Sequence, residues 1–170
     1  MKRLYSILIV IVALVVFAPL AVAADGHPAW NNQIKGPGRF QVLSKFTNAA
    51  VFDKETGLVW ERQPSTGGNN WFNRLTRCYN LEVGGRKGWR VPTIEELASL
   101  VDTSQPAPTL PAGHPFINVQ SSVYWSATTD AGDTSGAWAV NFNGGGVGAS
   151  DKTNSHFVWC VRGGQGIDGL

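Results

Sequence analysis

The 170-residue sequence has few cysteines and little excess charge of either sign. Its only cysteines are Cys78 and Cys160, and 14 Lys and Arg residues stand against 12 Asp and Glu residues. This near balance argues against a nucleic-acid partner, which a clustered basic surface would attract. The three histidines have no metal-ligand spacing, and no serine lies in a nucleophile-elbow pattern. The motifs therefore indicate neither a metal site nor a serine hydrolase.

A long apolar run occurs only at the amino terminus. Residues 1–23 begin with Lys2 and Arg3, continue through an apolar block and end in Ala-Val-Ala, the small-x-small pattern that signal peptidase reads. The block is shorter than the roughly 20 residues that cross a bilayer. We therefore expect a cleaved signal peptide; the alternative is an uncleaved anchor. Cleavage removes two of the 14 basic residues and leaves 12 against 12 acidic ones. The mature protein is expected to be exported, neutral and free of the membrane.

Export decides how the two cysteines are interpreted. In an oxidising compartment two cysteines pair by default, so we expect a disulfide between Cys78 and Cys160. The alternative is a nucleophilic or metal-binding thiol. Cys78 shares an apolar stripe with Trp71 and Leu75 on an expected helix that Asn70 caps and a following Gly-Gly pair ends. A position on a buried stripe disfavours a reactive thiol.

The mature chain divides into an extension, one domain and a tail. Residues 24–39 are rich in Gly, Pro and Asn without periodicity, which indicates an N-terminal extension. We expect the domain over residues 40–164 and a short tail over 165–170. The first signal in the domain is a hairpin over 50–60, in which Gly57 takes a left-handed turn position.

The stretch GWRVPTIEEL, residues 88–97, can be a catalytic constellation or the start of a helix. Thr93 and Glu96 have the spacing of a capping box, and Pro92 stands directly before the cap. Apolar residues follow at helical spacing. We therefore assign Thr93 and Glu96 to structure. Arg90, between two apolar residues, is expected to be a partly buried group that bonds carbonyls or a carboxylate; the alternative is a ligand contact.

The second half combines a long loop with strand-like segments. Four prolines between 103 and 122 exclude a regular element there, and loops of this length are commonly functional or disordered. Strands are expected over 123–128, 138–142 and 157–161. The last has apolar residues on both faces, which is typical of a central strand. Turns are expected over 129–136 and 143–155.

These turns supply the candidate ligand-binding residues. The polar side chains there that have no obvious local partners are Asp130, Asp133, Asn141, Asn143 and Asp151. We expect the binding surface to include them; the alternative is that they only keep exposed turns soluble. The acids can offer oxygen ligands to Ca²⁺, but no EF-hand loop is present. No metal, other cofactor or catalytic residue is therefore assigned.

Five segments follow one another in a recognisable order: DKETGLVW, GWRVPTIEELASLVD, YWSATT, AWAVNF and CVRGG. Together they resemble the bacterial Lcl C-terminal domain family, which is named after the terminal domain of a collagen-like adhesin. The resemblance covers about residues 40–164, and its specificity comes from the combination of the motifs.

The resemblance implies an α+β domain with a C-type-lectin-like fold, related to the formylglycine-generating-enzyme group. In that fold two helices flank a twisted antiparallel sheet, the first and last strands are adjacent, and a long irregular loop region presents the binding surface. It also implies a bacterial protein that is periplasmic, secreted or on the cell surface, and that in some members binds glycans. The chain lacks a collagen-like repeat, the calcium signatures of sugar-binding lectins and the paired active cysteines of the oxidase relatives.

These expectations leave more than one class of function. The first is an exported, non-catalytic binding or adhesion module for an extracellular glycan, protein or matrix. The alternatives are an oxidase of the formylglycine-generating type and a receptor with diversified loops. A buried bridge between Cys78 and Cys160 would leave no catalytic thiol, so the state of these cysteines separates the first two. Trp30 in the extension is the next candidate contact if the turn residues do not bind. The sequence specifies neither the ligand nor the oligomeric state.

Overall fold

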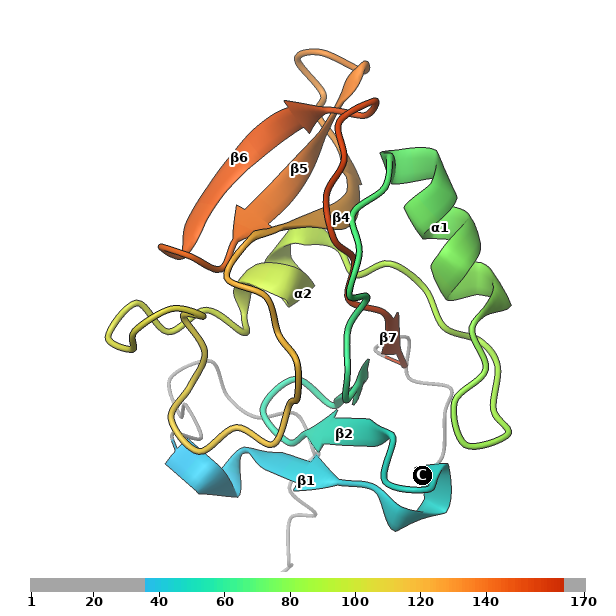
Figure 1. The fold of residues 1–170 in the computed structure, drawn as a ribbon, viewed down its shortest axis with the longest axis vertical. Helices are drawn as coiled ribbons and strands as arrows, with labels where there is room; N and C mark the ends of the chain where they lie inside the picture. The colour runs from blue at the N-terminus through green and yellow to red at the C-terminus, as the bar shows by residue number, and fades with distance from the viewer. Residues whose placement is uncertain (1–35, 164–170) are drawn as a thin grey trace, which may run out of the picture.

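The computed structural model describes residues 36–163, whose strands form two antiparallel sheets (Figure 1). The strands are β1 (Phe40–Val42), β2 (Ala50–Asp53), β3 (Leu58–Glu61), β4 (Val123–Thr129), β5 (Gly136–Asn141), β6 (Gly146–Asp151) and β7 (Val161–Arg162). The helices are α1 (Trp71–Asn80) and α2 (Ile94–Ala98), with 3-10 turns η1 (Gly36–Gly38) and η2 (Ser44–Phe46). None of the helices in the described range is long and apolar enough to span a membrane. The predicted signal peptide, Trp30 and the tail lie outside the described residues.

The mixed α and β composition is confirmed, but the expectation of a single sheet is wrong. One sheet has the strand order β1-β2-β3-β7 and the other the order β4-β5-β6. The segment 157–162 passes from one sheet to the other: Phe157 bridges to Tyr124 of β4, and Val161 pairs with Trp60 of β3. Residues 157–161 thus bond to the two sheets in turn, and the sheets do not share a continuous ladder. The first and last strands lie at opposite edges of their sheet, not beside each other as the resemblance implied.

The strand expected over 157–161 is therefore much shorter in the structure. Only Val161 and Arg162 are regular strand, because the preceding residues bond to a different partner at each step. The Phe157 carbonyl accepts from the Trp125 amide, while the Cys160 carbonyl accepts from the Glu61 amide. The prediction that this segment is covered on both faces is confirmed, since residues 158–161 are all fully buried.

Helix α1 begins where the sequence predicts and ends earlier. The Asn70 side chain accepts from the Asn73 amide and caps the helix, which ends at Asn80. The Gly-Gly pair lies beyond the end, in a tight turn that the mutual Val83 and Arg86 hydrogen bonds close. Gly84 there has φ +57°, and a Cβ on it would lie 2.4 Å from the Phe46 Cα atom. Only glycine fits that position without moving backbone.

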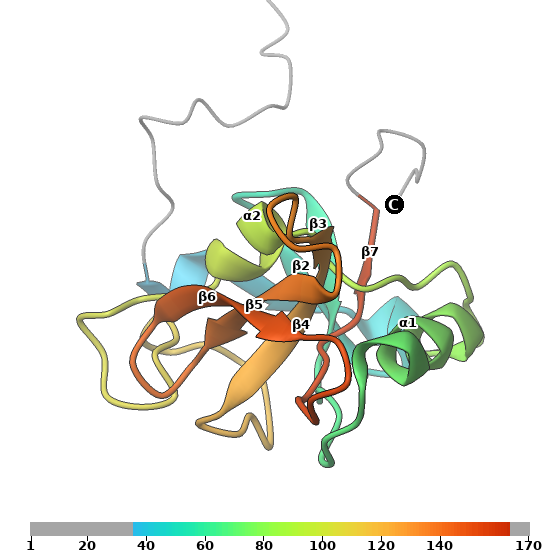
Figure 2. The same ribbon diagram turned by 90° about the horizontal axis from the view of Figure 1, so that it is seen from above.

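Helix α2 lies between the two sheets, whereas α1 lies well apart from it (Figures 1 and 2). The predicted capping box is present: the Thr93 side chain accepts from the Glu96 amide, and the Glu96 side chain accepts from the Thr93 amide. Leu97 and Leu100 then join a single buried cluster with Trp60 of β3 and Tyr124 of β4. This short helix therefore packs both sheets into one core.

The three-stranded sheet confirms one prediction and corrects another. The strand expected over 123–128 is β4. The range 143–155, expected to consist of turns, contains β6, which pairs with β5 in regular antiparallel register from Gly136↔Asp151 to Asn141↔Gly146. Glycine-rich strands have low intrinsic β propensity, so the local composition concealed an element that backbone pairing with β5 holds in place.

The amino-terminal border of the described domain includes a buried ion pair. Arg39 falls in the segment predicted as an extension, yet it is 6% exposed. Its guanidinium donates to both carboxylate oxygens of Asp53, at 2.9 and 2.7 Å. Asp53 also accepts from the Glu55 amide and the Thr56 hydroxyl, so it closes the β2–β3 turn. Gly57 takes the predicted left-handed conformation in that turn, with φ +71°.

Candidate functional site

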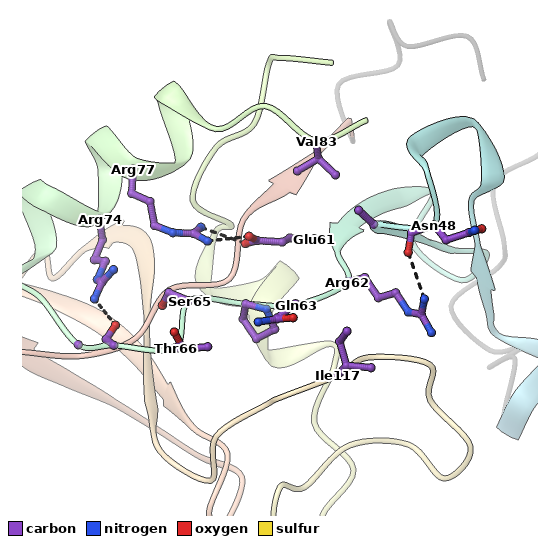
Figure 3. Close-up of a pocket in the computed structure, with 14 residues that line it drawn as sticks. Asn48, Glu61, Arg62, Gln63, Ser65, Thr66, Arg74, Arg77, Val83 and Ile117 are labelled. Carbon is purple, nitrogen blue, oxygen red and sulfur yellow. Dashed lines mark hydrogen bonds and ion pairs between the residues drawn. The ribbon is translucent and has the colours of Figure 1, made fainter. Parts of the chain in front are cut away.

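An open hollow of about 650 Å³ lies between α1 and the chain that leaves β3 (Figure 3). It is lined by five segments of the described chain: Asn48 and Ala49 before β2, residues 61–68, α1, Val83 in the turn after α1, and Ile117 of the long loop. Its volume lies within the ~300–1,000 Å³ typical of ligand pockets. Its lining contains four charged side chains, those of Glu61, Arg62, Arg74 and Arg77.

The position of α1 over this hollow follows from the disulfide. Cys78 and Cys160 are bridged, as the sequence predicts, across a sequence separation of 82. Arg74 and Arg77 precede Cys78 by four and one residues, so they lie on or next to the helix face that the bridge holds against the last segment of the chain. Both arginines project from α1 toward the residues after β3 (Figure 3).

Arg77 and Glu61 form the central contact of the hollow. The Arg77 Nη2 atom lies 2.6 Å from Glu61 Oε1, and Nη1 lies 3.0 Å from Oε2. Nη1 also contacts the Cys160 Sγ atom. The Glu61 side chain is 9% exposed and that of Arg77 is 28% exposed. Burial raises the pKa of Glu61 above its ordinary value, and this effect outweighs the opposing hydrogen bonds and positive charge of Arg77.

The other two arginines bond backbone carbonyls around the hollow. Arg74 donates from Nε to the His156 carbonyl at 3.2 Å and from Nη2 to the Gly67 carbonyl. Burial lowers the pKa of Arg74, and the positive charge of Arg77 lowers it further. Arg62 donates from Nε to the Pro115 carbonyl at 3.0 Å and from Nη1 to the Asn48 carbonyl at 3.2 Å.

The charges of the hollow do not balance. Three guanidinium groups face one carboxylate, so the lining has a formal excess of two positive charges. The carbonyl bonds of Arg62 and Arg74 account for where these side chains lie, but carbonyls carry no charge to offset theirs. Each guanidinium has five N–H donors, and the bonds described use two on Arg62 and two on Arg74. The arrangement is suited to accept an anionic group.

The residues that the sequence assigned to ligand binding do not come together. Asp130, Asp133 and Asp151 lie at one end of the three-stranded sheet, where Asp151 pairs with Gly136. Asn141 and Asn143 lie at the opposite end, where Asn141 pairs with Gly146. The two ends of this six-residue ladder are roughly 17 Å apart at ~3.4 Å per residue. The five residues therefore form two separate groups.

The expectation that these side chains lack local partners is wrong for four of the five. Each of the four accepts from the backbone amide two residues ahead: Asp130 from Gly132, Asp133 from Ser135, Asn141 from Asn143 and Asp151 from Thr153. Such bonds are the reason that Asp and Asn occur in turns. Hydrogen bonds from the Ser135 side chain and amide hold the pKa of Asp133 below its ordinary value, and those from Thr153 do the same for Asp151. Their role in ligand binding stays a prediction.

The structural role of Arg90, Thr93 and Glu96 is confirmed. Arg90 donates from both terminal nitrogens to the two carboxylate oxygens of Glu96, each at 2.7 Å, and also to the Gly163 carbonyl. Burial alone would raise the pKa of Glu96, but the Arg90 and Thr93 hydrogen bonds bring it below its ordinary value. The pair thus joins the helix cap to the end of β7.

A second hollow, of about 440 Å³, lies on the other side of α1 next to this pair. Its lining is mostly apolar and includes Leu75, Trp89 and Val91. Tyr79 also lines it and is 79% exposed. The charged side chains that line it in the described part of the chain are Arg90 and Glu96, which already neutralise each other. This hollow therefore has no excess charge with which to select a ligand.

Sequence reasoning missed the arginines of the first hollow. The apolar stripe of Trp71, Leu75 and Cys78 predicts which side of the helix is buried, but it does not indicate a role for Arg74 on the same side. Two arginines three residues apart, next to a cysteine expected to be bridged, are the signal that was available. The contribution of Arg62 had no signal, because its proximity depends on the path of the long loop.

Comparison with known proteins gives a family for the chain. No curated protein matches it. The model of the Lcl C-terminal domain family matches residues 49–162, which is more than half of the chain. The match includes the disulfide and the three arginines of the first hollow, Arg62, Arg74 and Arg77, after which we call it the arginine hollow. The chain belongs to the Lcl C-terminal domain family.

Proposed function

We propose that this protein is an exported bacterial binding module without catalytic activity, and that it holds an extracellular glycan by an anionic group in the arginine hollow. The observation that carries the proposal is the charge of the lining, three guanidinium groups against one carboxylate. Guanidinium groups bind carboxylate, sulfate and phosphate oxygens in bidentate geometry. Membership of the Lcl C-terminal domain family supports an extracellular type of module.

The size and openness of the hollow favour a glycan over a folded protein surface. A volume of about 650 Å³ accommodates a small number of sugar rings. The hollow is open to solvent, so an extended chain can enter and leave. An acidic segment of an extracellular protein is the second class of ligand that the same charge would accept.

The disulfide supports a non-catalytic role. Both cysteines of the chain are in the bridge, and both are fully buried. An oxidase of the formylglycine-generating type needs reactive thiols, which this state of the chain does not offer. A C-type-lectin-like relationship is part of the proposal: a mixed α and β domain, a long loop and a bridge from the first helix to the last segment support it.

The proposal is tested on an array of acidic glycans, neutral glycans and matrix proteins. The mature chain from residue 24 is applied with Ca²⁺ and with a chelator, because calcium binding is also an open prediction. Acidic glycans should be retained and their neutral counterparts should not. Retention of neutral and acidic glycans alike would contradict the role of the hollow, and retention of acidic proteins alone would favour the second ligand class.

A single substitution in the hollow connects array binding to the site. Arg62→Gln removes one positive charge while keeping a polar side chain, and the affinity for acidic glycans should fall about fivefold or more, since one charge at ~4 Å is worth ~1 kcal/mol even in water. Lys87→Gln is the matched control, because Lys87 is exposed and does not line the hollow. Circular dichroism verifies that both variants fold. Equal affinity of Arg62→Gln and Lys87→Gln would place the ligand elsewhere.

A further inference from the structure

The Glu61 carboxylate lies where an anionic ligand would be expected to meet Arg77. It accepts hydrogen bonds from both terminal nitrogens of Arg77, at 2.6 and 3.0 Å, which is the geometry that a ligand carboxylate or sulfate would use. Among the lining residues within the described range 36–163, Glu61 is the only acidic side chain. The anionic group of a ligand must therefore compete with Glu61 for Arg77, or rely on Arg62 and Arg74 alone.

We propose that Glu61 is a built-in competitor for the anionic group of the ligand, and that its protonation releases Arg77, so that the hollow binds anions more tightly in acidic surroundings. This inference rests on the proposed function, because it concerns the regulation of the same site. It assigns to Glu61 a role in affinity and pH response that family membership does not provide.

Arg77 stays at the hollow when Glu61 becomes neutral. Its helix is tied down by the Cys78–Cys160 bridge, and its own Nη1 atom contacts Cys160 Sγ. The side chain is 28% exposed, so a released guanidinium faces the open side of the hollow. Neutralising Glu61 therefore raises the formal charge of the lining from two positive charges to three.

The surroundings of Glu61 make its protonation accessible. Burial raises the pKa of Glu61, against the lowering effects of Arg77 and of the Cys160 amide at 3.5 Å. A raised pKa means that the carboxyl takes up its proton at a higher pH than an exposed glutamate would. An ionised ligand bound near Arg77 adds a negative charge beside Glu61 and favours that protonation further.

The charged groups around Glu61 come from two elements. Arg77 and Arg74 face the hollow from α1, and Arg62 follows Glu61 directly in the chain. The segment 156–160 contributes backbone groups: the His156 carbonyl accepts from Arg74, and the Cys160 amide approaches Glu61. The His156 ring points elsewhere, with Nε2 2.8 Å from the Ser150 hydroxyl. Burial lowers the pKa of His156, so His156 takes up its proton in acidic solution as well. It therefore needs a control of its own.

The test uses sulfate as the probe, because sulfate keeps its charge across the pH range of interest. Calorimetric titrations of the mature chain are made at about pH 8 and about pH 5 with ionic strength held by chloride. The wild-type affinity should rise at the lower pH. Glu61→Gln should bind sulfate at least about fivefold more tightly than the wild type at about pH 8 and should lose most of the pH dependence.

Two controls separate this effect from others. Glu95→Gln removes the same charge from an exposed position on α2 and should leave both the affinity and its pH dependence unchanged. His156→Gln removes the imidazole and should keep the pH dependence. If Glu61→Gln does not fold, the pH dependence of sulfate affinity in the wild type and in His156→Gln still decides. Both proteins must bind sulfate more tightly at acidic pH.

The outcomes distinguish this inference from the proposed function. If the wild type binds sulfate and Glu61→Gln binds it equally with the same pH dependence, Glu61 is not a competitor, while the anion site remains. A pH dependence that disappears in His156→Gln would also overturn the inference. If neither the wild type nor Glu61→Gln binds sulfate at either pH, the anion site itself is wrong, and both proposals are overturned.

Discussion

His114 is a half-buried histidine with one buried ring nitrogen that is unpaired among the described residues. Its ring stacks against Phe116 with centroids 5.8 Å apart, and its buried Nδ1 atom has no hydrogen-bond partner within the described part of the chain. Burial lowers the pKa of His114 below 6.5. The neutral imidazole is thus the form that suits the folded protein, whereas the charged form suits the unfolded chain.

This difference predicts a loss of stability in mild acid. Because the folded pKa of His114 is below the unfolded value, the unfolded chain takes up more protons as the pH falls below about 6.5, and the free energy of unfolding decreases. His114→Leu should remove this contribution, so the variant should lose less stability than the wild type between about pH 7 and about pH 5. Urea unfolding at several pH values measures the free energy of unfolding of both proteins. If it falls equally with pH in the wild type and in His114→Leu, His114 is not the cause of the loss.

Helix α2 is short, and its ends decide whether it forms. It has five residues, Ile94–Ala98, which is less than two turns. Isolated helices of this length are not stable in water, so the capping box and the packing of Leu97 provide what the hydrogen bonds of the helix cannot. The bidentate Arg90–Glu96 pair fixes the same carboxylate that caps the helix.

Thr93→Ala should therefore lower the free energy of unfolding by about 1 kcal/mol. Chemical denaturation measures the loss, and Thr93→Ser, which keeps the hydroxyl, should restore most of the stability. Because Thr93 does not line the arginine hollow, the affinity for sulfate should stay unchanged in both variants. A loss of sulfate binding in Thr93→Ala without loss of stability would show that the cap has a functional role instead.

The elements that the sequence predicts well are those with local chemical signals. The Thr93 cap, the left-handed Gly57 turn and the start of α1 at Asn70 depend on a few neighbouring residues, and all three are confirmed. Strand β6 has no such signal, because its glycines and small residues resemble a turn and only its partner β5 makes it a strand. For β7 the sequence predicts too long a strand, because an apolar run indicates burial but not regular pairing.

At the scale of the whole molecule, the candidate site depends on contacts that no local pattern encodes. The hollow brings together the turn before β2, the chain after β3, α1 and the long loop. The disulfide was predictable from the cysteine count and the expectation of export, and it determines which face of α1 meets residues 157–162. The partition of strands into two sheets was not predictable, because it depends on where the last segment crosses the core. Polarity alone points to the turn residues as ligand contacts, but the side chains of Asp130, Asp133, Asn141 and Asp151 use polar atoms to form the turns.

We propose that anions bind in the arginine hollow and not at the turns of the three-stranded sheet. The most direct test is a nuclear magnetic resonance titration of the labelled mature chain with sulfate. We predict saturable shifts at the side-chain Nε–H groups of Arg62, Arg74 and Arg77 and at the amides of residues 66–68, with little change at the turns that hold Asp133 and Asp151. Saturable shifts confined to those turns, or no saturable shift anywhere, would show that the hollow is not the anion site.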